Sequence, residues 1–573
     1  NQFKEIDYNF DLSNVKTDEE YIFSLKQLLF ILYKKNKDDY REYIISGQAN
    51  IWEMMGQSYF DLVNKQLFLN NLKVDYINNS YMMASREVKK IIQVLSESYF
   101  ILTRFERTMG LDRYLSIINK KDLDLLYSII DKIKSIANSK LEKYKDLYQT
   151  KYNLTSIYDV SKYMLLDENK NTPITSNFPS NQEKVILIVL DGFGFAQYLW
   201  SLEYYKKTKK YAYNENILNY LRKENMLIEN FIASSLISDT GAGLSQIFTG
   251  LLPKETGIIA SKIYRGDYKK FYPSNFIYKS PFINIKKLNS TRFDKISSNT
   301  TNMLNYFSLN NINTNVYFCS RYNKNGFSEY CFGESNVHEI LPPERVFSLL
   351  LGDLKLSSKE KSIDVIYYTA LDNTGHPTGA FTSFELFEHQ KINSLLNNFL
   401  IELLMHKPEL FNGKSTILIT ADHGMTDSSN KKISRDIFYS LYPKFIKNKN
   451  AIVENNRSFL FYDIDTLNID KTVLKIKKVL TKNNIDAKVV TCNDELFKKL
   501  LYKDNNLLSK NLPDIVVLIE GDGIIFSKNI NENLYHYGGH GGRSIEEVFV
   551  PLLGINLSED LKQKLENKFF KLT

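Results

Sequence analysis

Four short apolar runs, separated by helical stretches, constrain the fold of the second part of this chain: Val185–Leu190, Asp364–Ala370, Thr416–Thr420 and Asp514–Ile519. Each run is nearly continuous in apolar character, which is typical of strands buried on both faces. Such strands alternating with helices predict a three-layer α/β domain with a mainly parallel central sheet. Functional residues of such sheets gather beyond the carboxyl ends of the strands.

The first part of the chain has a different pattern. Residues 1–170 contain few helix breakers, and a capping-box pattern at Thr17–Glu20 precedes the first of several apolar-periodic stretches, among them 84–107 and 113–148. The segment Asn171–Gln182 is rich in Asn, Ser, Thr and Pro, as linkers are. We therefore predict a helical N-terminal domain over residues 1–180 and an α/β domain over residues 181–573.

Composition narrows the function classes. The net charge of +8 is spread along the 573 residues, and residues 1–180 carry nearly equal numbers of basic and acidic side chains, so a nucleic-acid module is not indicated. Three cysteines cannot form a disulfide framework in a chain of this size, which favours a reducing compartment. No apolar run is long enough to span a bilayer and no signal pattern opens the sequence, so we expect a cytoplasmic protein without a membrane partner.

Three of the predicted strands are followed by an aspartate: Asp191 after the first, Asp372 after the second and Asp422 after the third. His376 lies four residues beyond Asp372, and His423 is adjacent to Asp422. Three carboxylates at one edge of a sheet would repel one another unless cations lay between them. The sequence therefore predicts a metal site at this edge.

A further histidine, His540, lies in a glycine-rich segment near the C-terminus, Tyr537–Ser544. Glycines would let the backbone bring an imidazole close to a crowded site. A ligand set of nitrogen and oxygen without thiolate suits Zn²⁺ first and Mn²⁺ as the alternative, better than Mg²⁺.

The order and spacing of these motifs resemble the alkaline phosphatase superfamily, especially its nucleotide pyrophosphatase/phosphodiesterase-like branch. In that family a nucleophilic Thr stands nine residues ahead of a Thr-Gly pair, as Thr240 stands ahead of Thr249-Gly250 in the segment Ser238–Gly250. The resemblance extends from Val185 to about Leu553. It implies an alkaline-phosphatase-like fold for that part of the chain.

The resemblance also implies a ligand set for two divalent ions. One ion would be held by Asp191, Thr240, Asp422 and His423, and the other by Asp372, His376 and His540.

Where phosphodiesterases of the family often place an Asn three residues after the nucleophile, this chain has Gly243, so we consider a backbone N–H near Gly241 as the donor to the phosphoryl oxygens. Ser544–Glu547 matches a capping box, for which we expect a structural role. For Arg543 we consider both a phosphate contact and a structural role.

The resemblance implies a metal-dependent hydrolase that acts on a phosphate ester or nucleotide, through attack by Thr240 on a phosphodiester or pyrophosphate bond. Two alternatives stay open. The chain could be a phosphomonoesterase, or it could act mainly within an assembly, like a phage-defence component of the PglZ type, with residues 1–180 docking to a protein partner.

Overall fold

The computed structural model of the protein describes residues 88–99, 131–142, 159–160, 182–207, 216–264, 282–284, 302–318, 326–333, 335–339, 344–356, 361–427, 432–434, 436–439, 452–462, 464, 466–495, 512–521, 523–526 and 538–570. The chain forms two compact units, residues 1–77 with 87–140, and residues 78–86 with 141–573. The Thr17–Glu20 pattern and the domain boundary predicted at residue 180 lie outside the described residues.

The N-terminal part is helical where it is described. Helices cover 88–99 and 131–142, inside the stretches predicted from apolar periodicity. Val88, Ile91, Ile92 and Leu95 of the first helix are fully buried, as their helical spacing predicts.

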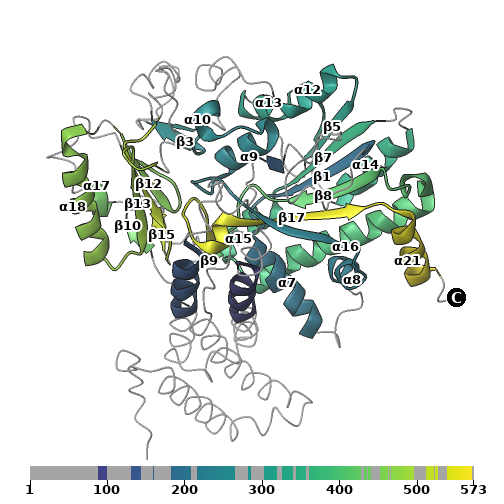
Figure 1. The fold of residues 1–573 in the computed structure, drawn as a ribbon, viewed down its shortest axis with the longest axis horizontal. Helices are drawn as coiled ribbons and strands as arrows, with labels where there is room; N and C mark the ends of the chain where they lie inside the picture. The colour runs from purple at the N-terminus through teal and green to yellow at the C-terminus, as the bar shows by residue number, and fades with distance from the viewer. Residues whose placement is uncertain are drawn as a thin grey trace, which may run out of the picture. The chain divides into compact units, whose positions relative to one another are not determined.

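A seven-stranded sheet forms the centre of the second unit (Figure 1). β1 pairs in parallel with β7 and β8, and β5 pairs in parallel with β6 and β7, whereas β17 runs antiparallel to both β8 and β2. This confirms the mainly parallel sheet. The strand order is β2 (Ile228–Ala233), β17 (Phe549–Asn556), β8 (Ser415–Thr420), β1 (Lys184–Leu190), β7 (Ser362–Tyr368), β5 (Asn313–Phe318) and β6 (Asn336–Glu339).

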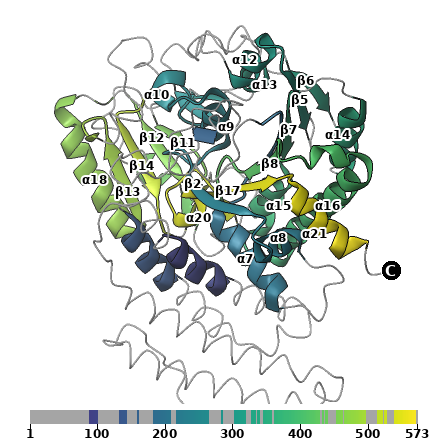
Figure 2. The same cartoon turned by 45° about the vertical axis from the view of Figure 1, so that its right-hand side comes forward.

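Helices cover both faces of this sheet, which completes the predicted three layers (Figures 1 and 2). Every residue of β7 and β8 is buried, because these strands pack against helices on both sides. One layer contains α9 (Thr240–Thr249), α12 (Met303–Leu309) and α13 (Gly326–Phe332); the other contains α7 (Phe195–Lys207), α8 (Ile217–Lys223), α14 (Glu344–Leu356), α16 (Ser383–His406) and α21 (Glu559–Phe569).

The predicted strand Asp514–Ile519 exists, but not in the central sheet. It forms β14 (Ile515–Ile519), which lies in a separate antiparallel sheet with β11 (Ile452–Glu454), β12 (Ser458–Phe461) and β13 (Ala487–Thr491). Helix α18 (Ile469–Lys482) packs on this sheet through Ile476 and Leu480. All five residues of β14 are buried, so the apolar run correctly indicated burial on both faces, but burial does not determine strand direction.

None of the described helices is long and apolar enough to cross a membrane.

Shorter elements complete the described fold. The remaining elements are α10 (Pro253–Thr256), α15 (Ala370–Thr378), α17 (Asp436–Tyr439), α20 (Ile545–Val548), the 3-10 helices Pro408–Leu410 and Thr466–Asn468, and the paired strands β3 (Lys262–Tyr264) with β4 (Phe282–Asn284), β10 (Lys432–Ser434) with β15 (Ile524–Phe526), and β9 (Thr426–Asp427) with β16 (Gly538–Gly539).

Candidate metal centre

The carboxyl ends of three neighbouring strands bring the predicted acids to one edge of the sheet. Asp191 follows β1 directly, Asp372 lies in the first turn of α15 after β7, and Asp422 follows β8. The strand ends are level, because Leu190 of β1 lies opposite Tyr368 of β7. The backbone N–H of Asp372 donates to the carbonyl oxygen of Asp191 at 3.1 Å, which joins the two acid-bearing segments.

The first of two side-chain groups, site 1, consists of Asp191, Asp422 and His423. His423 Nε2 lies 3.4 Å from Asp191 Oδ1 and 3.7 Å from Asp422 Oδ2. The hydroxyl oxygen of Thr240, the first residue of α9, lies 3.2 Å from the same nitrogen. All four residues are buried.

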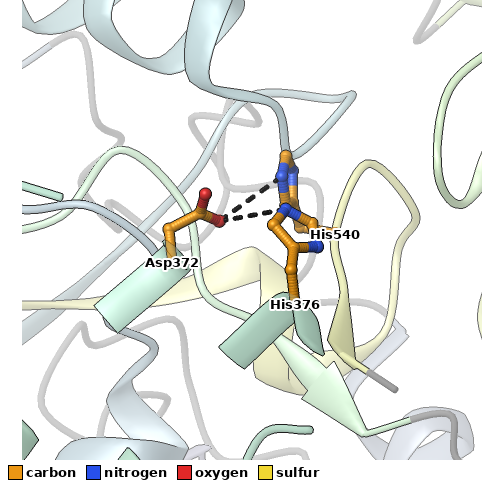
Figure 3. A group of neighbouring side chains, drawn as sticks. All are labelled: Asp372, His376 and His540. Carbon is orange, nitrogen blue, oxygen red and sulfur yellow. Dashed lines mark ion pairs between the residues drawn. The ribbon is translucent and has the colours of Figure 1, made fainter. Parts of the chain in front are cut away.

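The second group, site 2, consists of Asp372, His376 and His540 (Figure 3). Asp372 Oδ1 lies 3.4 Å from His376 Nε2 and 3.6 Å from His540 Nε2, so both imidazoles point at one carboxylate oxygen. His540 reaches this place because β16 pairs with β9, just beyond His423. The rings of His423 and His540 stack with centroids 3.8 Å apart, so the two sites are adjacent.

The three histidines turn the same ring nitrogen, Nε2, toward the acids. A carbonyl oxygen can only accept a hydrogen bond, so each Nδ1 near a carbonyl oxygen must carry the proton. His376 Nδ1 donates to Gly538 O (3.0 Å), His423 Nδ1 to Gly424 O (2.9 Å) and His540 Nδ1 to Ser238 O (2.9 Å). Burial lowers the pKa of His540 well below its usual value and keeps this ring neutral.

Metal ions fit this arrangement. The neutral Nε2 of His540 carries a lone pair, which repels the facing Asp372 oxygen unless a cation lies between them. Two ligands at zinc distances of about 2.0–2.1 Å in a tetrahedral site lie about 3.4 Å apart, close to the separations in both groups. Among the described residues, the buried Oδ1 of Asp372 accepts no hydrogen bond. The two groups therefore have the donors and the spacing of nitrogen and oxygen metal sites.

In the segment where we predicted a backbone donor near Gly241, the N–H of Gly241 itself is already engaged. This N–H already donates to Asp239 Oδ1 (2.9 Å) and Ser261 Oγ (3.1 Å), because Asp239 is the N-cap of α9. Position 243 has no room for a larger residue, since a Cβ there would lie 2.5 Å from the carbonyl oxygen of Asp422. The close packing of α9 on the Asp422 segment thus explains why no Asn stands at Gly243.

Tyr367, which the sequence did not single out, orients a site 1 acid. Its hydroxyl donates to Asp191 Oδ2 at 2.5 Å, which leaves Oδ1 facing His423. Burial, followed by the charges of Asp191 and Asp422, raises the pKa of Tyr367 well above its ordinary value, so the phenol remains a donor. The one signal in the sequence was its place beside the carboxyl end of a predicted strand.

Arg543 and the Ser544–Glu547 pattern have structural surroundings. Arg543 is buried, with its guanidinium 3.8 Å from Glu520 and 3.7 Å from Glu142. Glu547 Oε2 accepts hydrogen bonds from the Ser544 N–H (3.0 Å) and hydroxyl (2.5 Å), which confirms the capping box at the start of α20. This cap fixes the segment that follows His540.

Comparison with known proteins assigns the family. A sequence model of the type I phosphodiesterase/nucleotide pyrophosphatase family matches residues 185–543. No curated protein sequence matches the chain. Among solved structures, murine ectonucleotide pyrophosphatase/phosphodiesterase 5 in complex with AMP is 15% identical, with a TM-score of 0.44, over 65% of this chain and 88% of that chain. Phosphonoacetate hydrolase from Sinorhizobium meliloti is 13% identical, with a TM-score of 0.46, over 66% and 91%.

The match spans more than half of the chain and contains all seven predicted site residues, from Asp191 to His540. The chain belongs to the type I phosphodiesterase/nucleotide pyrophosphatase family of the alkaline phosphatase superfamily and is a metal-dependent hydrolase.

Proposed function

We propose that the protein cleaves phosphodiester or nucleotide pyrophosphate bonds with two divalent metal ions and Thr240 as the nucleophile. Site 1 with Thr240 would hold one ion, and site 2 the other. When bound, the ions supply Lewis acidity that favours the ionised hydroxyl and stabilises negative charge on the phosphoryl oxygens, whereas a histidine base alone contributes roughly 10²–10⁴-fold. Zn²⁺ is the expected metal, with Mn²⁺ as the alternative.

One observation carries the proposal: the Thr240 hydroxyl and both site 1 carboxylates converge on the same nitrogen, His423 Nε2. In a nucleophile–histidine–acid triad the acid binds the opposite ring nitrogen. Here that nitrogen, His423 Nδ1, donates a hydrogen bond to the carbonyl oxygen of Gly424. The arrangement therefore favours a cation site that includes Thr240 over a metal-free triad.

The reaction would proceed in two displacements. Thr240 Oγ1 releases its proton to solvent and bonds to phosphorus, while the bond from phosphorus to the leaving oxygen breaks and that oxygen keeps the electron pair. Water then attacks the phospho-threonine, releasing the phosphorylated product and restoring the hydroxyl. Asp239 supports this step by capping α9, which fixes the helix start where Thr240 lies.

The substrate class follows from the residues beside the nucleophile. A monoester dianion would need extra positive charge, yet α9 contains no basic residue in Thr240–Thr249. Gly241 and Ala242, the small residues directly after Thr240, would leave space for a second ester substituent, whereas the Asp422 segment fills the space beside Gly243. We therefore propose that diesters and pyrophosphates are cleaved better than monoesters.

Comparing kcat/KM for bis-p-nitrophenyl phosphate, p-nitrophenyl phosphate and a dinucleotide tests the proposal. We expect the diesters to be preferred, and Thr240→Ala to lower kcat/KM for the diester by at least about 10³-fold. Thr240→Ser, which keeps a hydroxyl, is the matched control and should retain measurable turnover. A monoester preference would overturn the substrate class, and an undiminished Thr240→Ala enzyme would overturn the mechanism.

A further inference from the structure

A buried glutamine, Gln197 of α7, connects the two segments that bear the site 1 ligands. Its Oε1 accepts the backbone N–H of Gly194 at 2.6 Å and that of Met425 at 3.3 Å. Gly194 stands three residues after Asp191, and Met425 stands two residues after His423. A single side-chain oxygen thus joins the loop after β1 to the loop after β8.

The two loops also touch directly at this point. A Cβ on Gly194 would lie 2.7 Å from Gln197 Oε1 and 3.3 Å from Gly424 Cα. A Cβ on Gly424 would lie 2.8 Å from Gly194 Cα. Because neither position has room for a side chain, the spacing of the two loops is set by backbone contact, with the Gln197 amide as its polar link.

The other end of the Gln197 amide is held by Glu385, a buried residue of α16. Gln197 Nε2 donates to Glu385 Oε1, and the backbone N–H of Phe381 donates to Glu385 Oε2 at 2.5 Å. Phe381 has a φ of 63°, a left-handed conformation that is uncommon outside glycine. Its ring packs edge-on against Trp200, one helical turn beyond Gln197.

These contacts leave the Gln197 amide one orientation. Two backbone N–H groups require its oxygen on one side, and an acid requires its NH₂ on the other. Burial raises the pKa of Glu385 to about 8, while its hydrogen bonds with Phe381 and Gln197 act in the opposite direction. Both the protonated and the ionised carboxyl can accept from Gln197 Nε2.

We propose that Gln197 is a positioning residue for site 1, which holds the Asp191 segment and the Asp422–His423 segment at the separation that one metal ion requires, and that Glu385 fixes its orientation. The inference rests on the proposed metal centre. Partners that orient metal ligands typically change metal affinity by about 10–100-fold when they are mutated.

Exchanging the two side chains gives a sharp test. In Glu385→Gln the new amide has one oxygen but faces two hydrogen-bond donors, Gln197 Nε2 and the Phe381 N–H. Its own NH₂ group must therefore face one of these donors, which leaves two N–H groups in conflict. Adding Gln197→Glu removes that conflict. The carboxylate introduced at position 197 accepts from Gly194, from Met425 and from the amide at position 385, whose oxygen then accepts from Phe381. Gln197→Leu provides an independent test that leaves the acid in place.

Zn²⁺ affinity would be measured by competition with a chromogenic chelator on the full-length chain. An Asp372→Ala background isolates site 1, and an Asp422→Ala background isolates site 2. Gln182→Leu is the matched control, because Gln182 is a buried glutamine just before β1, at the opposite end of that strand, where it binds Gly413 O and Thr416.

We expect Glu385→Gln and Gln197→Leu to weaken Zn²⁺ binding at site 1 by about 10–100-fold. Their Zn²⁺ affinity at site 2, and the affinity of the Gln182→Leu protein at either site, should stay close to the parental values. The Gln197→Glu/Glu385→Gln protein should regain the parental site 1 affinity. Three results would overturn the inference while the proposed function stands: unchanged site 1 affinity in Gln197→Leu, equal losses of affinity at both sites, or no recovery of affinity in the exchanged protein. Parent proteins that bind no Zn²⁺ would overturn both.

Discussion

At the scale of single residues, the site depends on which atom of each side chain is already engaged. Every histidine of the two groups uses Nδ1 on a backbone carbonyl, which leaves Nε2 for the centre. Tyr367 does the same for an acid, since it engages Asp191 Oδ2 and leaves Oδ1 directed inward. Such outer partners make the ligand geometry independent of the ion that enters.

Removing the Tyr367 hydroxyl tests this role. Tyr367→Phe should weaken Zn²⁺ binding at site 1 by about 10–100-fold, because the Asp191 carboxylate loses the bond that orients it. Tyr317→Phe is a suitable control, since Tyr317 is a buried tyrosine of β5 that donates to Asp353 at 2.6 Å, a residue outside both sites. Chelator-competition titrations that gave equal affinities for both variants would contradict the assignment.

His389 predicts a pH dependence of folding stability. Burial lowers the pKa of this histidine to about 3, and its ring packs against Phe193 and Trp200. The unfolded chain binds a proton near pH 6.5 whereas the folded chain does not, so this residue's contribution is full above pH 6.5 and falls as pH falls from 6.5 toward 3.

The matched variant is His389→Leu, which removes the titration and keeps an apolar side chain. Between pH 6.5 and 5, the wild-type free energy of unfolding should fall relative to the variant by up to about 1.4 kcal/mol per pH unit. Denaturant unfolding of both metal-free proteins across this range measures the difference. Parallel pH profiles would show that His389 is protonated or solvated in the folded chain.

The sequence singled out the side chains that the structure brings together in the two groups, but not the residues that support them. Asp191, Asp372 and Asp422 were visible because acids directly after buried strands must share one sheet edge. Tyr367 and Gln197 were not visible, since a tyrosine in a strand and a glutamine in a helix are ordinary until their partners are known. The engagement of the Gly241 N–H was only partly visible, because Asp239 is the adjacent N-cap whereas Ser261 lies in a loop twenty residues away.

At the scale of elements, α20 packs against both loops that Gln197 joins, the loop after β1 and the loop after β8. The carbonyl oxygen of Glu546 lies where a Cβ on Gly194 or Gly424 would be, and the N–H of Gly424 donates to Glu547 O at 3.0 Å. The capping box of α20 holds these carbonyls in place. The helix is only four residues long, so its effect comes from position and not from length.

Gly424→Ala tests that packing. The added methyl would clash with Glu546 O and approach Gly194 Cα to 2.8 Å, so we expect a loss of about 1–3 kcal/mol in stability or more. Gly352→Ala in α14 is the control, because a Cβ there meets no atom within 4 Å and should stabilise the helix by about 0.5–1 kcal/mol. Calorimetric melting temperatures that shifted equally would contradict the packing described.

Strand burial was predictable from the sequence, but strand partnership was not. The runs before Asp191, Asp372 and Asp422 became parallel neighbours, as their spacing by helices predicts. The equally apolar β14 pairs antiparallel with β12 and β13 in the second sheet. A hydrophobic run indicates that a strand is buried. The strands that it pairs with depend on residues distant in sequence, which local periodicity does not encode.

At the scale of the whole molecule, five segments spread from Asp191 to His540 meet at one end of the central sheet. The three strand ends supply the acids, and α9 supplies Thr240. The segment directly after β16, which follows the second sheet in the chain, supplies His540. The family match covers this part of the chain and leaves residues 1–184 outside it. The docking role of residues 1–180 stays a prediction, which co-purification of the full chain with a protein partner would address.

The central claim is that site 1 and site 2 each hold one divalent ion. Anomalous X-ray scattering at the zinc edge, from crystals of the full-length chain loaded with Zn²⁺, locates such ions directly. We predict two peaks about 3.5–4 Å apart. One should lie within about 2.0–2.2 Å of ligand atoms of Asp191, Asp422 and His423, and the other within that distance of Asp372, His376 and His540. A single peak, or peaks ligated by other residues, would contradict the account.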